Sequence, residues 1–211
     1  MTSSFDEASS QKIKTLKPTL TNFKGTNGFL DDEQFLVYKN IIKDYIQSRL
    51  LNEGLLDGPY RCDIKDVKTK KVSERLKEVG NELEGKFKDS FSNMCERLTI
   101  TDTTAYPTFV GVVNELFSTG INWGRIVAFI VFSSRLAIHF KRNGMPEYVK
   151  SVYGWVARYM HTKLSTWIEA NRSWDGFLDH FDKKNENEKS SIFTATMAVA
   201  IGTCAYFLFN R

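Results

Sequence analysis

The sequence has few of the residues that interrupt helices or cross-link chains. Only 4 of its 211 residues are proline, and its periodic apolar stretches run past about ten residues, which favours helices over strands. Its three cysteines, Cys62, Cys95 and Cys204, are far apart and form no CxxC pair, so we expect reduced thiols in the cytosol. The polar, acidic N-terminus lacks a basic flank before an apolar run, which argues against a secretory signal there.

The sequence also lacks the motifs of common enzymes. It contains no GxSxG, P-loop or GxGxxG motif, and His139, His161 and His180 have no metal-ligand spacing. His139 follows an apolar run, as a core histidine does, and the other two are expected at helix surfaces. Asp179 and Asp182 are interpreted as solvated charges, since nothing pairs them into an acid-base site. We therefore expect no enzyme, no metal site and no cofactor.

No long block of one charge sign is present. The 29 basic and 25 acidic residues are interspersed and give a formal net charge of +4, which argues against nucleic-acid binding and supports only mild attraction to an anionic membrane. With 42% hydrophobic residues, the chain can bury one sizeable core, whereas two full domains would be cramped.

The first half of the sequence has apolar residues at helical spacing. Residues 1–30 are weakly patterned and are expected to form a flexible arm, and a helical domain is expected over residues 31–182. The first helix, from residue 31 to about 51, has an inner face at Phe35, Tyr38, Ile42, Tyr45 and Arg49. Glycines and a proline then break the pattern, and the charged stretch to residue 71 is predicted as a connection. The second helix carries a stripe at spacings of three and four, formed by Val72, Leu76, Val79, Leu83, Phe87, Phe91 and Met94.

The second half predicts four more helices. One covers residues 106–118, with Gly120 closing it and Asn122 capping the next. Residues 123–140 are apolar on nearly all sides, which predicts the buried central helix. A long amphipathic helix over residues 147 to about 171 should pack against it. A short helix follows, with Ser173 as its expected cap.

An uncharged segment lies at the C-terminal end. After a polar linker over residues 183–191, residues 192–209 carry no charge and would span about 27 Å as a helix, just enough for a hydrocarbon core. The alternative is a buried core helix; the terminal position and polar linker favour a membrane anchor that leaves the rest of the chain cytosolic. Its apolar residues include Ile192, Phe193, Met197, Val199, Ile201, Tyr206, Phe207, Leu208 and Phe209.

Four stretches resemble the homology motifs of the Bcl-2 family of apoptosis regulators, in the family's order. NELFSTGINWGRIVAF (residues 114–129) resembles the first motif, and WIEANRSWDGF (residues 167–177) resembles the second. RLKEVGNELEGKF (residues 75–87) resembles the third, an amphipathic death helix, and residues 38–50 resemble the fourth more weakly. The resemblance implies an all-α bundle of about eight helices around a central hydrophobic hairpin, plus the tail-anchor helix.

The resemblance also implies a surface groove that receives a partner's death helix. Arg125 would pair with the partner's Asp, Gly124 would leave room for its backbone, and Asn122 would cap the helix and offer a hydrogen bond. The groove itself would be lined by Phe87, Phe91, Met94, Val112, Glu115 and Leu116, with Phe132 at its floor. The alternatives are a solvated helix-start charge for Arg125 and ordinary core positions for the apolar residues.

The chain departs from the family pattern at three places. Its own death-motif helix, carried by Val72, Leu76, Val79, Gly80, Asn81, Glu82 and Leu83, has Asn81 in place of the usual Asp. As a donated ligand this helix should therefore be weaker, unless position 81 is simply exposed. In the second motif, carried by Trp167, Trp174, Asp175 and Phe177, Arg172 and Ser173 stand where two glycines are common. Gly85 should make the death-motif helix easier to pull away, a feature pointing toward the pore-forming branch.

The family contains guards, which sequester death helices, and effectors similar to Bax, Bak and Bok, which perforate the outer mitochondrial membrane. VVNELF, NWGRIVAF and TWIEAN look more like the guards, whereas RLAIHF and RLLNEGL look more like the effectors. The favoured prediction is a guard, with effector as the alternative. Expected partners are death-helix-bearing proteins, other family members in homo- or heterodimers, and a membrane. The expected location is the cytosolic face of the mitochondrial outer membrane, with endoplasmic reticulum or cytosol as alternatives.

Overall fold

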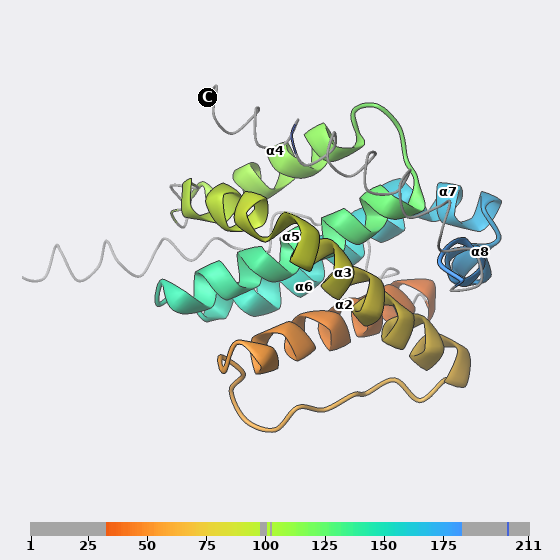
Figure 1. Cartoon of the computed structure of the whole chain (residues 1–211), viewed down its shortest axis with the longest axis horizontal. Coiled ribbons are helices and arrows are strands. Elements are labelled where there is room, and N and C mark those ends of the chain that lie inside the picture. Colours follow the sequence, from red (N-terminus) through yellow and green to blue (C-terminus); the bar gives the residue numbers. More distant parts are fainter. Residues whose placement is uncertain (1–32, 98–100, 102, 183–201, 203–211) are drawn as a thin grey trace, which may run out of the picture.

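The computed structural model describes residues 33–97, 101, 103–182 and 202, and within these ranges the regular structure is entirely helical (Figure 1). The helices are α2 (Glu33–Asn52), α3 (Val67–Arg97), α4 (Ala105–Phe117), α5 (Trp123–Arg142), α6 (Glu147–Tyr159), a π-helical turn (Met160–Leu164), α7 (Ser165–Ala170) and α8 (Ser173–His180). The prediction of an all-helical bundle is confirmed.

Helix α5 is the centre of the bundle, as its all-round apolar sequence predicts. Nearly all of its residues are buried, including the small polar Ser133 and Ser134, whose hydroxyls donate to carbonyls of the preceding turn. Helices α2, α3, α4 and α6 all pack on it. A tight turn with Gly144 at φ +74° brings α6 back along α5, which forms the expected hydrophobic hairpin.

Helix α3 begins earlier than the apolar stripe suggests. The charged residues 67–71, predicted as a connection, form its first turn. The Asp66 carboxylate accepts from the backbone amide of Thr69 at 2.6 Å, so it satisfies a free amide at the helix start. A cap of this kind starts a helix without any apolar periodicity in its first turn. The helical backbone is interrupted once, at Phe87, where φ is −124° and ψ is 25°.

The single helix predicted over residues 147–171 is divided by the π-helical turn at Met160–Leu164. Two hydroxyl groups explain the interruption. Thr162 donates to the Arg158 carbonyl at 2.8 Å, and Ser165 donates to the His161 carbonyl at 2.6 Å. Side-chain donors on these carbonyls compete with the backbone amides, which favours a wider turn.

The expected cap of the last helix is wrong. Ser173 is the first residue of α8, and the preceding Arg172 makes no side-chain cap hydrogen bond. Both residues have left-handed backbones, with φ of 65° and 52°, at the two places where the motif commonly has glycine. This conformation turns the chain sharply. A Cβ on Gly176 would lie 1.8 Å from the Asn171 carbonyl oxygen, so only glycine fits there.

The predicted arm, linker and membrane anchor lie outside the described residues, apart from the single residue Gly202. Within the described part of the chain, α5 has the length and hydropathy of a membrane-spanning helix, with a mean hydropathy of 1.3. Because 89% of that apolar window is buried inside the protein, α5 is the core helix of the bundle.

Candidate partner-binding site

Arg125 lies in the first turn of α5 and is 8% exposed. The expected cap is confirmed, because the Asn122 side chain accepts from the Arg125 amide at 2.8 Å. The guanidinium turns back toward the preceding loop, where Nη1 donates to the Gly120 carbonyl at 2.6 Å and Nη2 donates to the Thr119 hydroxyl. Gly120 has φ of 112°, which allows the loop to present that carbonyl. The loop therefore holds the guanidinium at the end of the bundle.

One donor of this guanidinium is left over. Nε of Arg125 is buried and has no hydrogen-bond partner among the described residues. A cation at the N-terminus of a helix is also opposed by the helix dipole, and its contacts with the loop are to neutral oxygens only. The position is therefore chemically suited to an incoming carboxylate, which would supply both a negative charge and an acceptor.

The predicted groove residues lie on three helices. Phe87, Phe91 and Met94 are on α3, whereas Val112, Glu115 and Leu116 are on α4. Both helices pack on α5, which contributes Phe132. The five residues that are at most 4% exposed are Phe91, Met94, Val112, Leu116 and Phe132. Phe87 and Glu115 are half-buried, and Gly124 is buried in the first turn of α5. In this structure the apolar set belongs to one continuous hydrophobic core.

The second homology motif packs against the first through an aromatic cluster. Trp123, the first residue of α5, meets Trp167 edge to face at a centroid distance of 5.1 Å. It also meets Phe177 at 5.7 Å and Trp174 at 6.1 Å. Asp175 is exposed and pairs with Lys68 of α3 at 2.7 Å. The start of α5, which carries Arg125, is thus fixed by rings from α7 and α8.

The death motif of this chain faces inward on α3. Val72, Leu76, Val79 and Leu83 are buried, and Glu82 is exposed. Gly80 is required by a close helix crossing, because a Cβ there would lie 2.3 Å from the Tyr45 hydroxyl on α2. Asn81 is exposed, yet its Oδ1 accepts from Nη1 of Arg49 at 2.6 Å.

Two buried ionic clusters attach this part of α3 to its neighbours. In the first, which we call the Glu84 cluster, the Glu84 carboxylate lies between Arg49 of α2 and Arg135 of α5. The Arg135 Nε lies 3.2 Å from Glu84 Oε1 without hydrogen-bond geometry, so this contact is an ion pair only. The three side chains are 4%, 12% and 11% exposed, respectively. Their mutual charge compensation is therefore needed for burial.

In the second, the Asp44 cluster, Asp44 of α2 accepts from Ser73 at 2.6 Å and pairs with Lys77 at 2.5 Å, both on α3. It also accepts from the Tyr60 hydroxyl. Burial alone would raise the pKa of Asp44, but hydrogen bonds from Lys77, Ser73 and Tyr60 outweigh it and lower the pKa below the ordinary value. Burial alone would lower the pKa of Lys77, but its contacts with Asp44 and Tyr60 outweigh it and raise the pKa.

Sequence reasoning missed most of these polar contacts. Nothing in the sequence around Thr119 marks it as a partner of Arg125. Glu84 and Arg135 lie on different helices, α3 and α5, and are far apart in the sequence. Only Arg49 gave a hint, because its spacing placed a charged residue on the inner face of the first helix. A charge on an inward face indicates a buried partner. Within the described residues, no group of three or more His, Cys, Asp and Glu side chains is placed to hold a metal ion.

The chain matches known proteins in sequence. The family model described as apoptosis regulator proteins, Bcl-2 family, matches residues 76–174. Bcl-2-like protein 1 of Rattus norvegicus is 36% identical over 147 residues, which cover 66% of this chain and 63% of the relative. The chain thus spans less than two thirds of the length of that relative. Apoptosis regulator R1 of Xenopus laevis is 29% identical over 171 residues, 77% of this chain and 73% of the relative.

Solved structures agree with the fold. Chicken BOK superposes with a TM-score of 0.62 at 25% identity, over 70% of this chain and 96% of that one. Trichoplax adhaerens trBcl-2L2, solved bound to trBak BH3, is 99% identical over 71% of this chain and 99% of its own, with a TM-score of 0.70. In the structure the first and second homology motifs are in contact through the rings of Trp123 and Trp167. With this contact, the similarities show that the chain belongs to the Bcl-2 family of apoptosis regulators.

Proposed function

We propose that this protein is a pro-survival member of the family, which binds the death helix (BH3) of pro-apoptotic partners and so restrains permeabilisation of the outer mitochondrial membrane. The observation that carries the proposal is the 99% identity to trBcl-2L2, a protein solved with a BH3 segment of Bak bound. At this identity, nearly every side chain of the helical domain is shared.

Arg125 is proposed to fix the register of the bound helix. Its Nε has no partner among the described residues, and its two Nη donors are bonded to neutral oxygens of the loop that precedes α5. A partner aspartate there would exchange weak neutral acceptors for a charge-assisted pair. The carboxylate would also lie at the positive end of the α5 dipole. Gly124, with no side chain, would leave room for the partner's backbone.

The apolar anchors of the partner are proposed to insert between α3 and α4, on the surface provided by α5. In the structure five of the residues predicted for this groove are buried and Phe87 and Glu115 are half-buried, so binding requires α4 and the C-terminal part of α3 to move apart. The helical break at Phe87 gives α3 a place to bend. Burial of the partner's apolar face would then replace the contacts that are lost.

The effector alternative is less well supported. A pore-forming member must expose its own death helix, and here that helix is held by the Glu84 and Asp44 clusters. Releasing it would take the Glu84 carboxylate from Arg49 and Arg135, and Lys77 and Ser73 from Asp44. Arg135 would keep only Glu53 and Asp44 only Tyr60, which is costly. We therefore propose that this helix stays in the bundle and that the chain acts as receptor.

Binding of a labelled Bak BH3 peptide, followed by fluorescence anisotropy, tests the proposal. We expect Arg125→Glu to raise Kd by about 30-fold or more, the scale for a desolvated charge pair worth 2 kcal/mol or above. Arg125→Lys keeps the charge but loses the planar fork, so it should cause a smaller loss. Arg61→Glu, which makes the same charge change at an exposed loop residue, is the matched control and should bind as the parent does.

Equal affinity of the Arg125→Glu and Arg61→Glu variants, both folded by circular dichroism, would disprove the register contact. A liposome assay separates the two functions. A guard should suppress dye release by an added effector and cause none alone, whereas release caused by this protein alone would support the effector.

Residues 192–209 are proposed to anchor the chain in the outer mitochondrial membrane, because the segment is uncharged and long enough to span a hydrocarbon core. The bulk of the chain would then face the cytosol.

A further inference from the structure

A recess lies between α2 and α6, far from Arg125. It encloses about 480 Å³, and its floor is apolar, with Leu50 and Leu55 from the end of α2 and the following turn, and Val149 from α6. Arg125 is in the first turn of α5 and Lys141, on the rim of the recess, is in the last. At 1.5 Å per residue the two sites are roughly 24 Å apart along α5. The recess is therefore independent of the proposed BH3 site.

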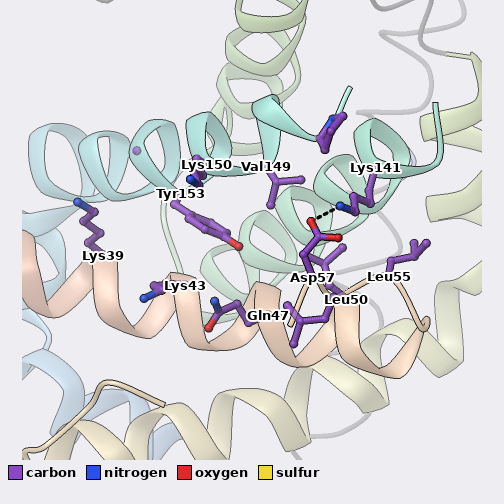
Figure 2. Close-up of a pocket in the computed structure, with 13 residues that line it drawn as sticks. Lys39, Lys43, Gln47, Leu50, Leu55, Asp57, Lys141, Val149, Lys150 and Tyr153 are labelled. Carbon is purple, nitrogen blue, oxygen red and sulfur yellow. Dashed lines mark hydrogen bonds and ion pairs between the residues drawn. The ribbon is translucent and has the colours of Figure 1, made fainter. Parts of the chain in front are cut away.

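The rim of the recess is basic. Lys39, Lys43, Lys141 and Lys150 line it, against a single carboxylate, Asp57 (Figure 2). Asp57 is already paired with Lys141. Lys43 pairs with Asp63 outside the recess. Lys39 and Lys150 have no ion-pair or hydrogen-bond partner among the described residues, so the rim carries uncompensated positive charge on both helices.

The wall of the recess holds two neutral polar groups. Gln47 Oε1 is buried and has no hydrogen-bond partner among the described residues. Such an acceptor can take a hydrogen bond from a donor on a ligand. Figure 2 shows the Tyr153 ring extending from α6 into the space that Gln47 faces from α2. Burial raises the pKa of Tyr153 to about 12, so its hydroxyl stays protonated and can donate.

These three features select one chemistry. The uncompensated lysines call for an anion, and the orphan Gln47 acceptor calls for a hydroxyl or amine donor on the same ligand. The apolar floor calls for a hydrocarbon portion. A soluble sugar phosphate would satisfy the first two requirements but would leave the apolar floor exposed to water. A phospholipid with a hydroxylated headgroup satisfies all three.

We propose that the α2–α6 recess binds an anionic phospholipid with a hydroxylated headgroup, such as a phosphatidylinositol. The phosphate lies between Lys39 and Lys150, a headgroup hydroxyl donates to Gln47, and the first carbons of an acyl chain lie on Leu50, Leu55 and Val149. The chain would then contact the membrane surface through its helical domain, at the end of α5 opposite Arg125.

Photo-crosslinking in vesicles tests the proposal with the full chain. The protein is bound to phosphatidylcholine vesicles that contain a small fraction of a photoactivatable phosphatidylinositol, and crosslinked residues are mapped by mass spectrometry. We expect labels within residues 39–57 and 146–154. The double variant Lys39→Glu/Lys150→Glu should reduce labelling there at least tenfold. Lys70→Glu/Lys163→Glu makes the same change in net charge at exposed positions outside the recess and should label as the parent does.

The proposal would be overturned by labels confined to other segments, by equal labelling with a phosphatidylcholine analogue, or by equal loss in the two double variants. Competition arms identify the source of the anion. Complete protection by inositol phosphate at low concentration would show that the recess recognises a soluble ligand and not a lipid. Because the BH3 peptide assay reads a different site, Lys39→Glu/Lys150→Glu should leave peptide affinity unchanged.

Discussion

The two parts of α3 on either side of Phe87 are held in different ways. Before the break, Ser73, Lys77, Asn81 and Glu84 make polar contacts to α2 and α5, in addition to the apolar stripe. After the break, Phe91 and Met94 are buried by apolar contacts, and no side-chain hydrogen bond or ion pair involves the described side chains from Phe87 to Met94.

This difference separates two tasks within one helix. Ion pairs and hydrogen bonds in low dielectric are directional, so they specify one position and are costly to break. Apolar contacts are non-directional, so a segment held only by them can shift and repack against a new apolar surface. The first part of α3 is thus fixed as a wall of the bundle, and under the proposed function the second part is the one that adjusts to a bound partner.

The largest effect is expected from the Glu84 cluster. Glu84→Gln keeps the shape of the side chain but leaves Arg49 and Arg135 without the carboxylate between them. We expect the free energy of unfolding to fall by about 3 kcal/mol, measured by urea denaturation. The control, Glu82→Gln, removes an exposed carboxylate from the same helix and should change stability by less than about 0.5 kcal/mol. Similar losses in both variants would contradict a special role for the Glu84 cluster.

Smaller effects of opposite sign are expected at two glycines of this helix. Gly80→Ala places a methyl group 2.3 Å from the Tyr45 hydroxyl and should cost about 1–2 kcal/mol of stability. Gly85→Ala meets nothing within 4 Å and should gain up to about 1 kcal/mol from helix propensity. Thermal unfolding followed by circular dichroism measures both.

A second substitution, Tyr45→Phe, should offset part of the stability lost in Gly80→Ala. Tyr45→Phe removes a buried hydroxyl that has no hydrogen-bond partner among the described residues, so by itself it should be nearly neutral. In the double variant with Gly80→Ala it should recover part of the lost stability, because the Tyr45 ring carbons Cε2 and Cζ would still lie 2.8 and 2.9 Å from the new methyl group. Failure of this rescue, or destabilisation by Gly85→Ala, would show that the crossing of α2 and α3 is not what requires glycine at position 80.

The smallest expected effect is a change in the pH dependence of stability, and it concerns the Asp44 cluster, which responds to acid. The folded state lowers the pKa of Asp44 below its ordinary value of 3.8, so the cluster stabilises the fold fully above that pH. This contribution is lost as pH falls through the lower, folded pKa. Asp44→Asn should therefore show a weaker fall in unfolding free energy below about pH 4 than the parent, and Ser73→Ala should be intermediate. Parallel pH curves for the parent and Asp44→Asn would contradict this.

Periodicity predicted the helices well where the core side is apolar. The inner faces of α2 and α3, the central α5 and the Asn122 cap all follow from spacing and side-chain type within a few residues. The start of α3 and the π-helical turn did not, because each depends on two local hydrogen bonds, from Thr69 to Asp66 or from Thr162 and Ser165 to carbonyls. Such bonds leave no periodic trace.

For the candidate site, the motifs predicted which residues matter but not what they contact. Arg125 was expected to face a partner, and in this structure it is bonded to its own loop. Asn81 was interpreted as a lost charge, and it accepts from Arg49. Both contacts depend on how distant segments meet in space. Conversely, the glycine positions replaced by Arg172 and Ser173 do keep the left-handed backbone that the motif implies.

The wide turn at Met160–Leu164 has one further consequence. A π-helical turn holds one more residue than the α-helical turn it replaces, so it absorbs an insertion without changing the direction of the chain. If the same residues were wound as a regular α-helix, everything downstream would rotate by about 100° around the helix axis. Trp167 would then point away from Trp123, and the two homology motifs would no longer meet. The rotational phase of α7 relative to α6 therefore depends on one residue in this turn. A homologue that lacks this residue can keep the contact between Trp123 and Trp167 only if its turn narrows to an α-helical one.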